Sequence, residues 1–268
     1  PSTTNGDAGQ SVLITGGAGM IGANLAARLV TEGKDVAVLV RPASNLLRLK
    51  SLDGDIRLLT GDVRDAESVK CVMDRVSPNI VYHLASTRFN PPTTTMREHF
   101  DVIALGTLNV LESMIGAESV RLVHVGSAAE YSGGNNISEI DPPNPTTALG
   151  AAKAAATIMV RTFSRLHKID AVTLRLFTPF GPWENSRRLI PHTILSALRR
   201  IDVEIVNGKP QRDFVYISDV IEAITAAGVM SVPTGTVLNV CSGDGTTVLD
   251  VVNLTLKLMG DPGNVRIG

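Results

Sequence analysis

Near its start the chain reads Val12-Leu-Ile-Thr-Gly-Gly-Ala-Gly-Met-Ile-Gly22. The short apolar run is typical of a strand that is buried on both faces. Small residues break this run, and a helical period follows from Asn24 to Val30. In a strand–turn–helix unit, glycines at Gly17, Gly19 and Gly22 let the chain turn tightly and let a pyrophosphate approach the helix N-terminus. The stretch predicts a dinucleotide site, with an ordinary strand-to-helix turn as the alternative.

The chain has 268 residues, of which 44% are hydrophobic, and a net charge of −1. This is enough for a large core, in one domain or one and a half. So small a charge does not attract nucleic acid or a membrane surface. No apolar run approaches the roughly 20 residues of a membrane span, and residues 1–10 lack the pattern of a signal peptide. We therefore expect a cytoplasmic protein with a flexible tail over residues 1–10 and no nucleic-acid or membrane partner.

The two cysteines, Cys71 and Cys241, lie far apart, and neither belongs to a CxxC motif or pairs with a histidine. This spacing predicts no disulfide and no metal site. We expect both to be small buried hydrophobic residues in a reducing compartment.

Strand and helix patterns alternate along the first two thirds of the chain, and hairpin signals are missing. Strands are expected near 34–41, 56–59, 79–86, 120–127 and 171–177, and helices over 24–30, 66–75, 96–115 and 148–167. Alternation of this kind predicts an α/β fold of the Rossmann type, a doubly wound parallel sheet. The later elements are too short for an independent domain. We expect a dinucleotide-binding domain over 11–180 with a return segment near 212–240, and a small substrate-binding cap over 181–211 and 241–268.

The end of the second strand carries the signal for cofactor choice. A fold that prefers NAD usually has an acidic residue there, to hold the ribose 2′-hydroxyl. Here Arg41 occupies this position, and Ser44 follows closely. Because an arginine pairs with a 2′-phosphate, the sequence favours NADP(H) over NAD(H). A surface arginine in a proline-containing loop is the alternative.

Two aspartates follow the third strand. Asp62 is placed to hydrogen-bond the adenine amino group, and Asp65 is placed to cap the helix that begins at Ala66. His83 and His124 lie inside strands and are expected to be structural. Ser127 ends the fifth strand, at the edge where doubly wound sheets bind their ligands.

Seven motifs occur in an order that resembles an extended short-chain dehydrogenase/reductase of the nucleoside-diphosphate-sugar epimerase/dehydratase type. They are Thr15-Gly-Gly-Ala-Gly-Met-Ile-Gly22, Gly61-Asp62-Val63, His83-Leu-Ala85, Gly106-Thr107, Arg175-x-Phe177-Thr-x-Phe-Gly181-Pro182, Gln211-Arg212-Asp213-Phe-Val-Tyr216 and Asn239-Val-Cys-Ser-Gly243. The resemblance covers about residues 11–260. Together with the dinucleotide signals above, it implies a cofactor site made by Gly16, Gly19, Met20, Ile21, Gly22, Arg41, Ser44, Asp62, Val63, Leu84, Ala85, Ser86, Lys153, Phe177 and Thr178. It implies a substrate site made by Thr87, Ser127, Leu149, Thr178, Phe180, Trp183, Arg212 and Tyr216.

The catalytic set of this family is Ser/Thr, Tyr and Lys, with Tyr-x-x-x-Lys on one helix face. Ser127 and Lys153 match this set, but Leu149 occupies the tyrosine position. Family members also carry an asparagine three residues before the Gly-Thr pair, where this chain has Ile103. Lys153 then keeps only its ribose-anchoring role, with a solvated helix lysine as the alternative. The missing proton is expected from Thr87, Ser127, Tyr131, Thr178, Tyr216 or His192, from water, or from the substrate.

Loss of the tyrosine disfavours sugar dehydration and epimerisation, because both oxidise an unactivated alcohol and need a base. The pattern resembles tyrosine-lacking ketoreductases that tailor aromatic polyketides, such as angucyclinone ketoreductases of the simocyclinone type. Our leading hypothesis is the NADPH-dependent reduction of a ketone on an angucyclinone-like substrate. The alternatives are an enzyme that modifies a nucleoside-diphosphate sugar and an inactive NADPH-binding protein. The resemblance also implies a homodimer through the helices near 96–116 and 148–167.

Overall fold

The computed structural model describes residues 9–87, 94–117, 119–134, 136–260 and 264–268. The chain divides into two compact units: unit 1 is Pro1–Leu176 with Ser218–Val240, and unit 2 is Phe177–Ile217 with Cys241–Gly268. The chain thus leaves unit 1 before 180 and returns to it after 212. Of the expected tail, residues 1–8 lie outside the described residues. Gln10 is anchored, because its amide oxygen accepts a hydrogen bond from Lys34 at 3.0 Å.

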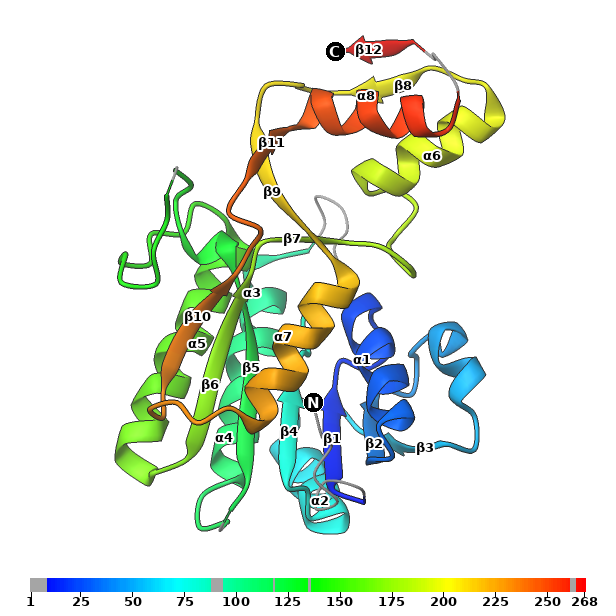
Figure 1. Cartoon of the computed structure of the whole chain (residues 1–268). Helices are drawn as coiled ribbons and strands as arrows, with labels where there is room; N and C mark the ends of the chain where they lie inside the picture. Colours follow the sequence, from blue (N-terminus) through cyan, green and yellow to red (C-terminus); the bar gives the residue numbers. More distant parts are fainter. Residues whose placement is uncertain (1–8, 88–93, 118, 135, 261–263) are drawn as a thin grey trace. The chain divides into compact units, whose positions relative to one another are not determined.

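A seven-stranded sheet forms the centre of unit 1, and its strands pair in parallel in the order β10-β6-β5-β4-β1-β2-β3 (Figure 1). The strands are β1 (Ser11–Thr15), β2 (Asp35–Val40), β3 (Ile56–Thr60), β4 (Ile80–His83), β5 (Arg121–Ser127), β6 (Asp170–Leu176) and β10 (Thr236–Val240). The order reverses at β1, which confirms the doubly wound parallel sheet predicted from the sequence.

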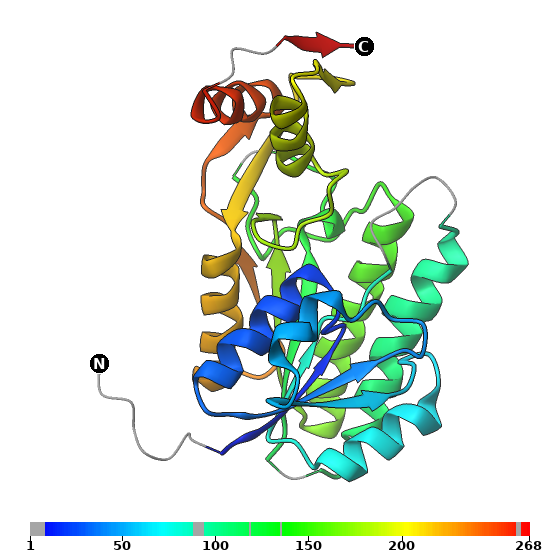
Figure 2. The same cartoon turned by 90° about the vertical axis from the view of Figure 1, so that its right-hand side faces the viewer.

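Helices cover both faces of this sheet. They are α1 (Met20–Thr31), η1 (Leu47–Leu52), α2 (Ala66–Val76), α3 (Met96–His99), η2 (Phe100–Leu105), α4 (Gly106–Ser113), η3 (Ala128–Glu130), α5 (Ala148–His167) and α7 (Ile217–Val229). Helices α2, α4 and α5 lie side by side along one face, and α1 and α7 lie on the other (Figures 1 and 2). All the carboxyl ends of the parallel strands therefore meet at one edge of the sheet.

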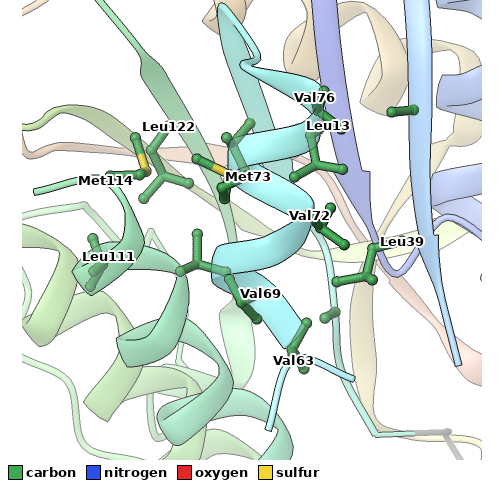
Figure 3. Packing of buried hydrophobic residues seen from close by; sticks show 14 of the residues in the cluster. Leu13, Leu39, Val63, Val69, Val72, Met73, Val76, Leu111, Met114 and Leu122 are labelled. Atoms are coloured by element: carbon green, nitrogen blue, oxygen red, sulfur yellow. The ribbon is translucent and has the colours of Figure 1, made fainter. Parts of the chain in front are cut away.

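Helix α2 shows how the sequence pattern builds the core. Its buried residues are Val69, Val72, Met73 and Val76. This i, i+3, i+4, i+7 spacing places them on one helix face. Figure 3 shows that face turned toward Leu13 and Leu39 of the strands and Met114 beyond α4.

Both cysteines are exposed, so the expectation that they are buried was wrong. Cys71 stands on α2 between Val69 and Val72, but the helical period turns it to the solvent-facing side. Cys241 follows the last residue of β10, a half-buried strand at the edge of the sheet.

The single helix expected over 96–115 is divided. Helix α3 is four residues long, η2 is a π-helical segment, and α4 begins at Gly106. The hydroxyl of Thr107, in the first turn of α4, donates to the carbonyl of Ile103 in η2 at 2.5 Å. π-Helical turns inside α-helices occur frequently at functional sites.

Unit 2 has two small sheets, in the orders β11-β9-β7 and β12-β8. Its elements are β7 (Thr178–Phe180), α6 (Leu189–Arg199), β8 (Val203–Ile205), β9 (Gln211–Tyr216), β11 (Gly245–Thr247), α8 (Val248–Leu258) and β12 (Val265–Ile267). Ala197, Val203, Ile205, Val252 and Leu256 form its own buried core between α6, β8 and α8. Across the described part of the chain, no helix is long and apolar enough to cross a membrane.

Candidate active site

The glycine turn after β1 accepts no side chain at two of its positions. Gly16 has a φ of +74°, and a Cβ there would lie 2.7 Å from backbone atoms of Leu84 and Ala85. A Cβ on Gly22 would lie 2.5 Å from the Gly16 carbonyl oxygen. The turn is therefore in direct contact with the segment that follows β4, and helix α1 begins immediately beyond it.

The N-terminus of α1 is open to an anion. Gly19 is its N-cap, no side chain caps it, and its first turn holds no acidic residue. A Cβ on Gly19 would meet only the Gly16 carbonyl, at 3.2 Å. The first N–H groups of the helix, including those of Met20 and Ile21, are thus available to an anion. This arrangement fits the pyrophosphate of a dinucleotide.

Charged residues follow β2 and β3. The Arg41 N–H donates to Ser44 Oγ at 3.0 Å, while the Arg41 side chain is exposed. Asp62 is paired with Arg64 at 2.6 Å, and this hydrogen bond is the main reason that the Asp62 pKa lies below its ordinary value. The Arg41 charge lowers this pKa further, so Arg41 and Asp62 lie near one another. Asp65 caps α2 as expected, by accepting from the Glu67 N–H. The adenine role of Asp62 and the 2′-phosphate role of Arg41 stay predictions.

The end of β4 is fixed by a buried histidine. The Thr15 hydroxyl lies 2.7 Å from His83 Nδ1, and Thr107 Oγ1 lies 3.0 Å from His83 Nε2. Because Thr107 donates its own proton to Ile103, His83 Nε2 is the donor in that contact. Burial, with a smaller effect of the Lys153 charge, lowers the His83 pKa to about 3. His83 is therefore a neutral structural residue, as expected, and it ties β1, β4 and α4 together.

Ser127 is held at the end of β5 by its neighbours. Its N–H donates to Glu130 Oε1 at 2.9 Å, and its Oγ accepts from the Ala129 N–H at 3.1 Å. The serine hydroxyl keeps its proton for another acceptor. Glu130 is fully buried and pairs with the buried Arg175 at 2.8 Å.

This ion pair continues into a wider network. Arg175 Nη1 donates to the Tyr131 hydroxyl at 2.7 Å, and that hydroxyl donates to Asn239 Oδ1 at 2.9 Å. The guanidinium also lies 4.6 Å from the centre of the Tyr131 ring. Sequence reasoning gave Glu130 and Asn239 no side-chain role, because nothing in a local pattern shows that three strand ends meet here.

Lys153 is buried on the face of α5 that meets β5. Its Nζ donates to the Val125 carbonyl at 2.6 Å. Burial lowers the Lys153 pKa to about 8, although the charge of Glu130 acts in the opposite direction. The alternative of a solvated helix lysine was therefore wrong. Its role at the nicotinamide ribose stays a prediction.

The two departures from the family pattern meet in one place. Leu149, one turn before Lys153 on α5, packs with Phe100 against a buried cluster of Ile103, Ala152 and Ala156. The positions where the family has a tyrosine and an asparagine thus form one apolar contact between α5 and η2. Beside it, Thr87 Oγ1 lies 2.8 Å from Nδ1 of His99, the residue before Phe100.

The remaining candidate residues belong to unit 2. Phe180 pairs with Tyr216 across β7 and β9, and their ring centres lie 5.4 Å apart. Arg212 is exposed and donates to the Gln211 carbonyl. The Asp213 carboxylate beside it accepts from the N–H groups of residues 242 and 243. Roles for these residues and for Phe177, Thr178 and Trp183 stay predictions.

A family model described as "NAD dependent epimerase/dehydratase family" matches residues 12–241. The chain belongs to this family. The match covers the glycine turn, Ser127 and Lys153, together with most of the motifs on which the sequence resemblance depended.

Two curated relatives of this chain are named for sugar nucleotides. The chain is 28% identical to the dTDP-glucose 4,6-dehydratase of Mycobacterium tuberculosis over 218 residues, which are 78% of this chain and 65% of that protein. It is 28% identical to the UDP-glucose 4-epimerase of Streptomyces lividans, over 93% of this chain and 81% of that protein. The match to the first relative thus spans less than two thirds of its length.

Solved structures of the epimerase/dehydratase family share the fold. The UDP-glucose 4-epimerase of Thermus thermophilus, in complex with NAD, superposes with a TM-score of 0.83 at 25% identity. This match covers 96% of the present chain and 86% of the other. The cofactor named for that neighbour is NAD, and the NADP(H) preference inferred from Arg41 stays a prediction.

Proposed function

We propose that the chain is a nicotinamide-dependent reductase that acts on a ketone carried by a nucleoside-diphosphate sugar. The observation that carries this proposal is Leu149. Leu149 stands where the family's catalytic set has its tyrosine acid. The other two members of that set, Ser127 and Lys153, are present, and so is the glycine turn. A leucine moves no proton, so a reaction that begins by oxidising an alcohol has no base at this position. Reduction begins from a carbonyl and needs only a proton at the end.

The residues of unit 1 have defined tasks in such a reaction. The turn at Gly16–Gly22 and the N-terminus of α1 bind the pyrophosphate, and Lys153 anchors the ribose. The bound nicotinamide supplies hydride. Ser127, whose hydroxyl proton is uncommitted, donates to the carbonyl oxygen of the substrate. One such oxyanion donor typically contributes about 10²–10³ in rate.

The relatives support a sugar-nucleotide substrate over an aromatic polyketide. Their names refer to dTDP-glucose and UDP-glucose, and the angucyclinone hypothesis gains no support from them. Arg212 adds a physical reason, because it is an exposed guanidinium on β9 and guanidinium groups bind phosphate oxygens in pairs. The exposed Arg41 supports NADPH as the preferred reductant.

Dehydration is disfavoured by the turn after β5 as well as by Leu149. Eliminating water from a sugar requires a group that exchanges protons. In the described turn, residues 128 and 129 are alanines, and the Glu130 carboxylate is occupied by Ser127 and Arg175. This part of the site therefore offers no free carboxylate for an elimination.

The test measures oxidation of NADPH and of NADH with dTDP- and UDP-linked 4-keto sugars, with dTDP-glucose and UDP-glucose as controls. We expect turnover of a keto sugar and no conversion of the two controls. Turnover of an angucyclinone but of no keto sugar would overturn the substrate class. Tight cofactor binding without turnover of any ketone would instead identify an inactive cofactor-binding protein.

A further inference from the structure

A hydroxyl–imidazole pair lies at the edge of the sheet that holds the cofactor turn. Thr87 Oγ1 is 2.8 Å from His99 Nδ1, a full hydrogen bond, and both residues are half-buried. Neither Thr87 nor His99 belongs to any of the seven motifs quoted from the sequence.

Its position follows from the fold of unit 1. Thr87 comes four residues after the end of β4, and the intervening Leu84 and Ala85 are in contact with Gly16 of the glycine turn. β4 also pairs with β5, which ends at Ser127. Ligands of doubly wound sheets bind outside these carboxyl ends. Thr87 therefore lies along the same edge as the glycine turn and Ser127.

The other half of the pair lies beside the missing acid. His99 is the last residue of α3, directly before Phe100, and Phe100 and Leu149 pack on the same buried cluster. Helix α3 itself packs against α5. The pair thus borders the apolar contact that replaces the family tyrosine.

The other two proton candidates in unit 1, the hydroxyls of Tyr131 and Ser127, are less suited to supply a proton. Tyr131 is buried, and its hydroxyl is already engaged by Arg175 and Asn239. Ser127 is oriented, but its hydroxyl is hydrogen-bonded to a backbone N–H and not to a titrating side chain. Thr87 alone of the three is hydrogen-bonded to an imidazole, the side chain suited to general acid catalysis near neutral pH.

We propose that Thr87 and His99 form the proton relay of this enzyme, which replaces the family tyrosine; this inference rests on the proposed reduction of a ketone. As hydride reaches the carbonyl carbon, the carbonyl electron pair moves to oxygen. That oxygen takes the Thr87 hydroxyl proton, and Thr87 Oγ1 takes the Nδ1 proton of the His99 imidazolium in the same step. His99 is left neutral and regains a proton from water.

Several charged groups lie on the elements that pack around the Thr87–His99 pair. On α3 and η2 they are Arg97, Glu98 and Asp101, and on α5 they are Lys153, Arg161, Arg165 and His167. Glu98 accepts from the Thr95 N–H in a capping box, and Lys153 is hydrogen-bonded to Val125. A general acid must carry its proton, so the relay predicts that kcat/KM falls as pH rises.

Four variants distinguish a proton relay from a hydrogen bond that only holds Thr87 against helix α3. Thr87→Val removes the hydroxyl, and Thr87→Ser keeps it. His99→Asn keeps an N–H donor that can reach Thr87 Oγ1 but cannot act as an acid. His167→Gln is the matched control: His167 is an exposed histidine in the last turn of α5, and its ring centre lies 5.0 Å from that of Phe163 in a tilted arrangement. Cofactor affinity and thermal unfolding verify that each variant is folded.

With the best keto-sugar substrate, we expect Thr87→Val and His99→Asn to lower kcat by about 10²-fold or more, while KM changes little. His99→Asn should also lose the alkaline limb of the pH profile. Thr87→Ser, which keeps the hydroxyl, should recover most of the activity that Thr87→Val loses, and His167→Gln should stay close to the wild type. Independently of turnover, the nitrogen-15 resonance of His99 Nδ1 should move in Thr87→Val, whereas that of His167 should not.

Two results would overturn the relay while leaving the reductase intact. One is that His99→Asn and Thr87→Val both keep the turnover and the pH profile of the wild-type enzyme. The other is a His99 resonance that is indifferent to Thr87. A wild-type enzyme that reduces no keto sugar would overturn the proposed function, and the relay with it.

Discussion

The buried pair of Glu130 and Arg175 is the feature that most directly links the stability of unit 1 to its site. Their side chains are 0% and 2% exposed, and Nε and Oε2 lie 2.8 Å apart. Arg175→Met leaves the Glu130 carboxylate buried with only the Ser127 N–H as a donor. Removing one partner of a buried ion pair typically costs about 3–5 kcal/mol. We therefore expect the free energy of unfolding of Arg175→Met to fall by about this amount.

A double-mutant cycle tests the reasoning. Glu130→Gln keeps an acceptor for the Ser127 N–H and removes the charge, so the double variant contains no unpaired buried ion. Its loss of unfolding free energy should be smaller than the sum of the two single losses by about 2 kcal/mol or more. In urea, with a slope of about 3 kcal/mol per M, the midpoint of Arg175→Met should drop by about 1 M or more.

An exposed pair provides the matched control. Arg57 and Asp35 lie 2.6 Å apart, with side chains 42% and 48% exposed. Because water screens such pairs, Arg57→Met should cost no more than about 1 kcal/mol. Additive losses for Glu130→Gln and Arg175→Met, or a loss no larger than that of Arg57→Met, would refute the assignment of this pair as a coupled buried anchor.

Further predictions concern the cofactor, a buried lysine and the missing acid. Gly19 has φ −77°, and a methyl group there would meet only the Gly16 carbonyl oxygen, at 3.2 Å, so Gly19→Ala should fold after a small shift of the turn yet bind both cofactors about tenfold more weakly; unchanged calorimetric affinities would contradict a pyrophosphate site. Arg41→Ala should weaken NADPH binding about tenfold more than NADH binding, and equal losses would argue against a 2′-phosphate contact. Between the folded Lys153 pKa of about 8 and the ordinary value of 10.5, only the unfolded chain holds the proton. Wild-type stability relative to Lys153→Met should therefore rise with pH across that window in denaturation curves, and a flat difference would refute it. Leu149→Tyr should give no large gain in kcat, and a gain of several orders of magnitude would mean that the native chain has no proton donor.

The regular part of the fold was predictable because its signals are local. The 3.6-residue and two-residue periods mark which residues each helix or strand buries, so the limits of α5 agree with the predicted range of 148–167. The π-helical segment η2 was not predictable, since its apolar pattern is that of a continuous helix. The exposure of Cys71 shows that a residue type is weaker evidence than its phase on the helix.

The sequence by itself determined the cofactor half of the site. The glycines, Ser127 and Lys153 lie at strand ends and helix starts, and chain order alone puts these at one edge of a parallel sheet. Only the tertiary structure decided how the proton half is arranged. Leu149 and Ile103 are far apart in the chain but share one buried cluster, and Thr87 meets His99, which lies twelve residues further along the chain. Glu130 finds Arg175 in the same way, because side-chain contacts between distant segments depend on packing that no local period records.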